Sequence, residues 1–291
     1  MGKVFNALRR AGQSDQAVDK VDEQALSSPS SPRQSQIDAD VRGVSSAVPK
    51  EPNRQRGQWD DRLVLATATT GPVAESIRAL RSRILYPSEG PVPHSILVTS
   101  AAPGEGKSFI CANLGISLAQ AMDNYCLVVD CDLRRPTQHA LFGLENKAGL
   151  SDYLRHNKGI PELLVPSGVD KLSILPAGPP PVNPAELLGS NSMIALVDEI
   201  SKRYSDRVVL LDSPPLHAAS ETAVLAQYVD GVVLVVRYGA SRREYVKALA
   251  DVIGREKILG IVFNAYKATV LDYKVFGYYE YQQEYYAKRP Q

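Results

Sequence analysis

The stretch Ser100-Ala101-Ala102-Pro103-Gly104-Glu105-Gly106-Lys107-Ser108 decides the fold, because it joins two segments of different character. The apolar run 96–98 before it is typical of a buried strand, and residues 109–121 after it favour a helix. Backbone N–H groups of a glycine-rich turn and the positive end of the next helix attract an anion. Lys107 can reach the outer phosphates and the Ser108 hydroxyl can bind Mg²⁺. The stretch predicts a loop that binds a nucleoside triphosphate, ATP, through Gly104, Glu105, Gly106, Lys107, Ser108 and Phe109.

The loop departs at one position from the usual pattern G-x-x-x-x-G-K-[ST], because Ala101 replaces the first glycine. The alternative is an ordinary glycine- and proline-rich connection that happens to be followed by a lysine and a serine. The predicted strand before the loop and the predicted helix after it favour phosphate binding.

Length and composition narrow the class of protein. With 291 residues, 44% of them hydrophobic, the chain can bury a full α/β core, and its net charge of +1 gives no sign of a nucleic-acid partner. No apolar run approaches the roughly 18 to 20 residues that cross a bilayer, and no leader opens the chain, so we expect a cytoplasmic protein. The cysteines lack metal-ligand spacing and are expected to be small buried residues: Cys111, Cys126 and Cys131.

Residues 1–62 differ in composition from the rest of the chain. They are rich in Ser, Pro, Gln, Asp and Arg and poor in large apolar side chains, so they cannot offset the entropy of ordering. We expect a disordered tether, in which residues 2–11 could form a short docking helix. A tail without a role is an equally good interpretation.

Residues 71–86 have the spacing of an amphipathic helix. One apolar stripe contains Val73, Ile77, Leu80 and Ile84. Beside it lie three charged residues, Glu75, Arg78 and Arg81. Charged residues at this spacing are most often a solvated helix face, and spacing alone favours that interpretation.

Two further apolar strands end in carboxylates. The strand 127–129 is followed by Asp130 and Asp132, and the strand 208–211 is followed by Asp212. Ligands gather at the carboxyl ends of parallel strands, so these side chains are expected beside the phosphates. There they could hold Mg²⁺ or accept a proton from an attacking hydroxyl. The alternative is an ordinary polar end of a strand.

The pattern as a whole predicts a doubly wound α/β domain with a mostly parallel sheet, spanning residues 63–264. Strands are expected near 95–100, 126–131, 172–176, 207–212, 231–237 and 258–264. Further helices are expected near 107–122, 184–204, 219–228 and 241–254. Right-handed crossovers would bring the three motif strands together at one edge of the sheet.

These motifs together resemble the bacterial tyrosine kinases (BY-kinases) of exopolysaccharide and capsule export, which are relatives of the MinD/ParA ATPases. The motifs are A-P-G-E-G-K-S at 102–108, D-C-D-L-R-R-P at 130–136 and L-L-D-S-P-P at 210–215. The residues Glu75, Arg78 and Arg81 match an E-x-x-R-x-x-R helix, and 176–188 matches a P-A-G…N-P-x-E-L-L segment. The resemblance covers about residues 70–291 and leaves the tether out.

Three positions qualify the resemblance. MinD/ParA proteins carry a signature lysine early in the loop, where this chain has Ala102. Ala101 is common among BY-kinases, and Ser213 stands where threonine is usual. Neither departure removes a catalytic group, so the BY-kinases are the better match.

The resemblance implies an ATP-dependent protein-tyrosine autokinase acting in polysaccharide synthesis or export. It implies that Lys107 and the loop amides hold the β- and γ-phosphates, and that Mg²⁺ binds Ser108 with Asp132 and Asp212 near. Asp130 would activate a tyrosine hydroxyl. The alternative function is a MinD/ParA-like ATPase that positions cargo without kinase activity. The intact catalytic groups disfavour a non-catalytic scaffold.

The carboxyl-terminal segment 265–291 is rich in tyrosine, and from 278 to 286 the tyrosines alternate with glutamate and glutamine. Such a composition is also compatible with an interaction tail. The resemblance implies instead that the tail is the substrate, offered to a neighbouring subunit. The acceptors would be Tyr273, Tyr278, Tyr279, Tyr281, Tyr285 and Tyr286.

The resemblance implies three further contacts. Glu75, Arg78 and Arg81 would assemble subunits into a ring. A separate membrane polypeptide of polysaccharide export would activate the kinase and recruit it to the inner face of the plasma membrane. Asn264, after the last predicted strand, would contact the nucleotide base.

Overall fold

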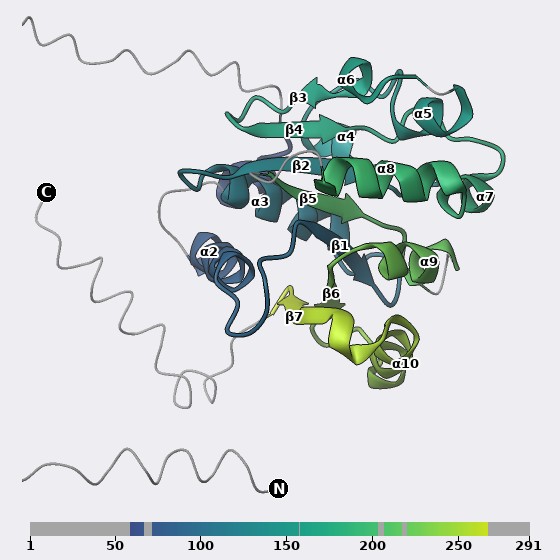
Figure 1. Ribbon diagram of the computed structural model, residues 1–291. Helices are drawn as coiled ribbons and strands as arrows, with labels where there is room; N and C mark the ends of the chain where they lie inside the picture. The colour runs from purple at the N-terminus through teal and green to yellow at the C-terminus, as the bar shows by residue number, and fades with distance from the viewer. Residues whose placement is uncertain (1–58, 67–71, 157, 203–206, 217–219, 267–291) are drawn as a thin grey trace, which may run out of the picture. The chain divides into compact units, whose positions relative to one another are not determined.

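The computed structural model describes residues 59–66, 72–156, 158–202, 207–216 and 220–266 (Figure 1). The predicted helix 2–11, nearly all of the predicted tether and the six predicted acceptor tyrosines lie outside the described residues. Within those ranges no helix combines the length and the apolar character needed to cross a membrane.

One sheet of seven strands organises the described part of the chain, in the order β3-β4-β2-β5-β1-β6-β7 (Figure 1). Neighbouring strands are parallel except for the antiparallel pair β3 and β4. The strands are β1 (Ser95–Ser100), β2 (Tyr125–Asp130), β3 (Val165–Pro166), β4 (Leu172–Leu175), β5 (Arg207–Asp212), β6 (Gly231–Arg237) and β7 (Ile258–Asn264). The predicted doubly wound, mostly parallel fold is confirmed.

The three motif strands β2, β5 and β1 are adjacent, as predicted, but they occupy the middle of the sheet and not an edge. The chain adds β4 and β3 beyond β2, and it adds β6 and β7 beyond β1. β3 was not predicted, because its two residues are too few to show a strand pattern.

Helices cover both faces of the sheet (Figure 1). On one face are α2 (Pro72–Leu85) and α3 (Lys107–Ala119), and on the other are α8 (Asn191–Lys202), α9 (Glu221–Tyr228) and α10 (Arg243–Ile253). The shorter helices are α1 (Asp61–Ala66), α4 (Gln138–Leu141), α5 (Leu150–His156), α6 (Ile160–Leu163), α7 (Pro184–Leu188) and the 3₁₀ helix Arg255–Lys257.

Alternate side chains of the central strands build two core layers. Leu97 and Leu211 belong to the layer under α8, α9 and α10, whereas Val98 and Leu210 belong to the layer under α2 and α3. All four side chains are fully buried. A strand that is buried on both faces reads as a continuous apolar run, which is why these strands were recognisable in the sequence.

The helix predicted over 184–204 is two helices, α7 and α8. Gly189 ends α7, and the Ser190 hydroxyl accepts a hydrogen bond from the N–H of Met193, in the first turn of α8, at 3.3 Å. Serine is a preferred residue at this position because its oxygen binds an N–H that has no partner within the helix.

Trp59, within the segment that the sequence assigned to the tether, contacts the domain. The Trp59 ring packs edge-on against Phe142, with centroids 5.8 Å apart, and its Nε1 donates to the carbonyl of Ser167 at 3.1 Å. Leu63, in α1, is fully buried. Leu63 therefore belongs to the core, and Trp59 packs against it.

Candidate active site

The glycine-rich loop connects β1 to α3, and its backbone conformation explains its glycines. Gly104 and Gly106 have φ angles of 79° and 92°, in the left-handed region that glycine adopts without strain. A Cβ atom at Gly106 would also lie 2.0 Å from the Nδ2 atom of Asn264. Gly106 is therefore required both by its conformation and by the close approach of β7.

Asn264 ends β7 and contacts the loop directly. Its side-chain amide donates a hydrogen bond to the carbonyl of Glu105 at 2.8 Å. The sequence predicted that Asn264 contacts a nucleotide base, which stays a prediction. What the structure adds is that this amide holds the backbone of the phosphate loop.

A second element holds the loop from the end of β6. The Glu105 carboxylate is almost fully buried, accepts the N–H of Ala102 at 3.1 Å and accepts the hydroxyl of Ser241. The Arg237 guanidinium donates to the carbonyl of Gly104 at 3.3 Å. Arg237 and Ser241 were not predicted, because no local pattern connects them to a loop more than 130 residues earlier.

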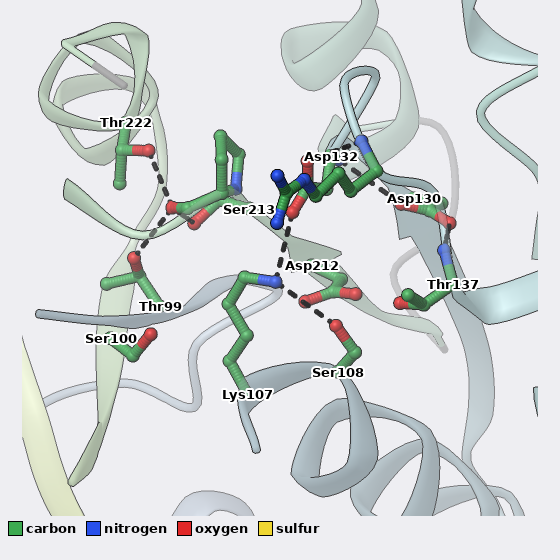
Figure 2. Close-up of polar contacts among 12 residues, drawn as sticks. Thr99, Ser100, Lys107, Ser108, Asp130, Asp132, Thr137, Asp212, Ser213 and Thr222 are labelled. Carbon is green, nitrogen blue, oxygen red and sulfur yellow. Dashed lines mark hydrogen bonds and ion pairs between the residues drawn. The ribbon is translucent and has the colours of Figure 1, made fainter. Parts of the chain in front are cut away.

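Lys107 and the predicted metal ligands converge on one space (Figure 2). The Lys107 ammonium donates to the Ser108 hydroxyl at 3.2 Å and to the Asp132 carboxylate at 3.1 Å. Burial by itself lowers the pKa of Lys107, but the carboxylates of Asp212 and Asp132 outweigh it and raise the pKa. The lysine is therefore a fixed positive charge at the loop.

Asp130 is held by backbone N–H groups. Its fully buried carboxylate accepts hydrogen bonds from Asp132 at 3.2 Å and from Thr137 and Gln138 at 2.9 Å each. Burial and then the negative charge of Asp212 raise the pKa of Asp130 to about 8. Asp130 therefore organises the loop between β2 and α4, and its pKa lies in the range in which the group can both bind and release a proton near neutral pH.

Asp212 is also fully buried, at the end of β5. Its Oδ2 accepts a hydrogen bond from the Gln138 side-chain amide at 2.8 Å, whereas its Oδ1 has no hydrogen-bond partner among the described residues. Burial raises the pKa of Asp212, although Lys107 and Gln138 act against that rise. Gln138 was not predicted, because a glutamine after a turn has no distinctive pattern.

The turn after Asp212 is anchored by hydroxyl groups (Figure 2). The carbonyl of Pro214 accepts hydrogen bonds from Thr99 at 3.2 Å, Ser213 at 3.2 Å and Thr222 at 2.8 Å. These donors come from β1, from the turn itself and from α9. The hydroxyl at position 213, where threonine is usual among BY-kinases, thus still makes an anchoring contact.

A cavity of about 500 Å³ lies over the loop. It is lined by Arg62, Pro103, Gly104, Gly106, Lys107, Ser108, Phe109, Asp132, Arg134, Arg135, Thr137, Leu141, Pro214 and Pro215. Asp130 and Asp212 are fully buried and are not among the lining residues. Of the lining arginines, Arg134 forms an ion pair at 3.1 Å with the buried Glu221, and the sequence predicted neither residue.

The site fits a magnesium nucleotide. The hydroxyl of Ser108 and the carboxylates of Asp132 and Asp212 are hard oxygen ligands of the kind that Mg²⁺ prefers, and Asp212 has an unpartnered buried oxygen. No group of three His, Cys, Asp or Glu side chains within the described ranges forms a metal site of its own. Mg²⁺ usually takes one or two protein carboxylates together with substrate phosphates and water.

The predicted assembly residues lie on α2, away from the cavity. Arg78 and Glu75 form an ion pair three residues apart, with an Nε–Oε2 distance of 3.2 Å. Arg81 donates to the carbonyl of Ser117 in α3 at 3.0 Å. Within the chain these side chains therefore order α2 and attach it to α3.

The three cysteines are buried and form no disulfide. This confirms that they are small core residues. Burial raises the pKa of each thiol far above its ordinary value.

Comparison with known proteins gives a consistent result. Residues 96–276 match the family described as CobQ/CobB/MinD/ParA nucleotide binding domain. The chain is 34% identical to the tyrosine-protein kinase YwqD of Bacillus subtilis over 229 residues, which are 78% of this chain and 94% of that protein. Its fold is similar to the crystal structure of the chimerical protein CapA2B2, with a TM-score of 0.66, 33% identity and coverage of 73% of this chain and 93% of that one.

A longer relative matches over only part of its length. The tyrosine-protein kinase wzc of Salmonella typhimurium is 30% identical over 225 residues, which are 77% of this chain but 31% of that protein. The chain thus spans about a third of this relative.

Proposed function

The chain belongs to the CobQ/CobB/MinD/ParA nucleotide-binding family and is a bacterial tyrosine-protein kinase, and from that membership we propose that it phosphorylates its own carboxyl-terminal tyrosines with ATP. The observation that carries the proposal is the position of Lys107. Its ammonium lies between the Ser108 hydroxyl and the Asp132 carboxylate, at the floor of the cavity. A triphosphate on this loop would present its outer phosphates to that ammonium.

In phosphoryl transfer the protein mainly positions the reacting groups and stabilises the charge on the phosphates. We propose that Lys107 and the loop amides orient the β- and γ-phosphates. Ser108, Asp132 and Asp212 would hold Mg²⁺, which when bound neutralises charge on the phosphates. The left-handed glycines of the loop turn its N–H groups toward the anion.

Asp130 is proposed as the base that accepts the proton of the tyrosine hydroxyl. The support is its position at the end of β2, paired with Asp212 and bonded to the backbone of the cavity residue Asp132. Its raised pKa is compatible with the role, since a base works best when its pKa lies near the operating pH. Its three backbone hydrogen bonds give it a second role, because they hold the turn that carries Asp132 in place.

We propose that transfer occurs between subunits. The acceptors would be Tyr273, Tyr278, Tyr279, Tyr281, Tyr285 and Tyr286, and α2 would join subunits into a ring through Glu75, Arg78 and Arg81. The support is the match of these α2 residues to the E-x-x-R-x-x-R helix of BY-kinases.

We also propose a role in exopolysaccharide or capsule synthesis and export. A membrane protein of that system would activate the kinase and recruit it to the inner face of the plasma membrane. The support is the family resemblance, together with the Salmonella relative, most of whose length lies outside the matched region.

The experiment is mass spectrometry of the tail after incubation of the purified protein with ATP and Mg²⁺. Phosphotyrosine should appear among residues 273–286 and should be absent from Lys107→Ala. Lys247→Ala is a matched control, because Lys247 is an exposed lysine of α10, which lies outside the cavity. Tail phosphorylation by Lys107→Ala would contradict the role of Lys107, and a wild-type tail without phosphotyrosine would contradict the proposed substrate.

A further inference from the structure

Gln138 contacts both halves of the proposed metal site. Its side-chain Nε2 donates to the Asp212 carboxylate at 2.8 Å and to the backbone carbonyl of Ser108 at 3.0 Å. The side chain is fully buried. One amide group thus joins the first turn of α3 to the end of β5.

The backbone of Gln138 is also held in place. Its N–H donates to the Asp130 carboxylate at 2.9 Å, and the neighbouring N–H of Thr137 donates to the same oxygen. These hydrogen bonds therefore fix the backbone position of Gln138 at the beginning of α4. Backbone and side chain together connect Gln138 to Asp130, Asp212 and Ser108.

The orientation of the amide follows from its neighbours. Both Asp212 Oδ2 and the Ser108 carbonyl are acceptors, so the NH₂ group must face them. The Oε1 atom then points away, and it is buried without a hydrogen-bond partner among the described residues. A rotated amide would place this oxygen against a carboxylate and would lose both hydrogen bonds.

We infer that Gln138 is a positioning residue, which holds the Asp212 carboxylate and Ser108 in the arrangement that binds Mg²⁺ with the nucleotide. The inference rests on the proposed assignment of Ser108 and Asp212 as metal ligands. The amide binds one carboxylate oxygen and so restricts rotation of the group, leaving Oδ1 for the metal or its water. Loss of a partner that orients a metal ligand typically costs about 10- to 100-fold in metal affinity or activity.

A glutamine suits this role better than a cation. An arginine or lysine would also bind Asp212, but its charge would neutralise the carboxylate and compete with Mg²⁺. A neutral amide orients the carboxylate and leaves its negative charge available. Lys107 supplies a positive charge at this site, but its hydrogen bond goes to Asp132 and, among the bonds found within the described ranges, none goes to Asp212.

Asn113 is a buried amide without a proposed role at the metal site, and we compare Gln138 with it. Asn113, in α3, is also buried, donates to the carbonyl of Phe109 at 2.7 Å and has an unpartnered Oδ1. It makes no hydrogen bond to a carboxylate among those found within the described ranges. Replacing Asn113 should therefore affect stability alone, and this makes it a matched control.

The test measures binding and not activity. A fluorescent ADP analogue is titrated into Gln138→Met, Asn113→Leu and the wild-type chain, once in excess EDTA and once across a MgCl₂ series. For Gln138→Met we expect unchanged affinity in EDTA and an apparent Kd for Mg²⁺ raised about tenfold, the low end of outer-shell effects. Asn113→Leu should lower Tm and leave the Mg²⁺ dependence as in the wild type.

Gln138→Asn covers the case in which Gln138→Met does not fold. It keeps an amide and the backbone hydrogen bond to Asp130, but its side chain is one methylene too short to reach both acceptors, so a smaller shift in the same direction is expected. An unchanged Mg²⁺ dependence in these variants, or an equal loss of affinity in EDTA and in Mg²⁺, would overturn the inference. ADP has no γ-phosphate to transfer, so this binding test does not depend on the kinase reaction. A tail that stays unphosphorylated with ATP would overturn the proposed function and not this inference.

Discussion

Asp130 and Asp212 are direct partners in the register of β2 and β5, and both carboxylates are fully buried. Two buried carboxylates on neighbouring strands repel each other, and burial penalises their charged forms. The fold compensates with backbone N–H groups at Asp130 and with the Gln138 amide at Asp212. The protein without ligands therefore stores unfavourable electrostatic energy at the place where we propose that Mg²⁺ binds.

Asp212→Asn should separate stability from function. The substitution removes one charge of the buried pair, so the ligand-free protein should unfold at a higher temperature, by about 2 to 4 °C for each kcal/mol gained. Mg²⁺-dependent nucleotide binding should weaken because a metal ligand is lost. Calorimetry and nucleotide titration with and without EDTA measure the two effects. A lower Tm together with unchanged Mg²⁺ dependence would contradict the assignment.

Asp130→Asn should reduce phosphoryl transfer more than it reduces nucleotide binding. A base of this kind contributes about 10² to 10⁴ in rate, so tail labelling should fall by that order while the Kd for ATP changes little. Asp130→Asn also removes one charge of the buried pair, but the amide offers one acceptor oxygen where the carboxylate offers two, so Tm should rise less than in Asp212→Asn. Asp132→Asn, by contrast, should weaken Mg²⁺-dependent binding. Equal losses of ATP affinity in both variants would refute this division of roles.

Gly106→Ala should lower Tm for two separable reasons. A left-handed residue other than glycine costs roughly 1 to 2 kcal/mol, and the new Cβ would collide with Asn264. The double variant Gly106→Ala with Asn264→Gly removes the collision and keeps the backbone strain, so it should recover part of the Tm lost by the single variant. If the double variant is no more stable than Gly106→Ala alone, the contact with Asn264 is not the cause.

Cysteine reactivity should report folding. Burial raises the thiol pKa of Cys111, Cys126 and Cys131, so the fraction of reactive thiolate is negligible in the native state near pH 8. Ellman's reagent should detect no thiol in the native protein and three after unfolding in guanidinium chloride. Rapid reaction of any cysteine in the native protein would show that its part of the core opens.

Disrupting α2 should make phosphorylation depend on concentration. Changing Glu75 and Arg78 together to alanine leaves the contact of Arg81 with Ser117 in place, so the variant should fold and yet fail to form a ring. Light scattering should show smaller particles, and anti-phosphotyrosine blots across a dilution series should show labelling that falls on dilution. Labelling by a monomeric variant at a rate independent of concentration would show that the tail reacts within its own chain.

The sequence by itself determined the local chemistry of this protein. Consecutive residues identify the order of strand, glycine-rich loop and helix around Lys107. They also identify the carboxylates that follow two apolar strands. Each predicted strand begins and ends within about a residue of the observed one. The reason is clearest for β1, β2, β5 and β6, since a strand buried on both faces is a continuous apolar run. Helices as short as α4 and α6 escaped prediction because four residues do not complete a periodic pattern.

The tertiary structure alone decided which distant residues support that chemistry. Gln138 meets Asp212 across 74 positions of the chain, and Asn264 meets Glu105 across 159. Such contacts depend on how parallel strands are ordered in the sheet, and each involves a single polar side chain without periodicity around it. Local patterns therefore identify the groups that react, whereas the packing of the whole sheet selects the groups that hold them in position.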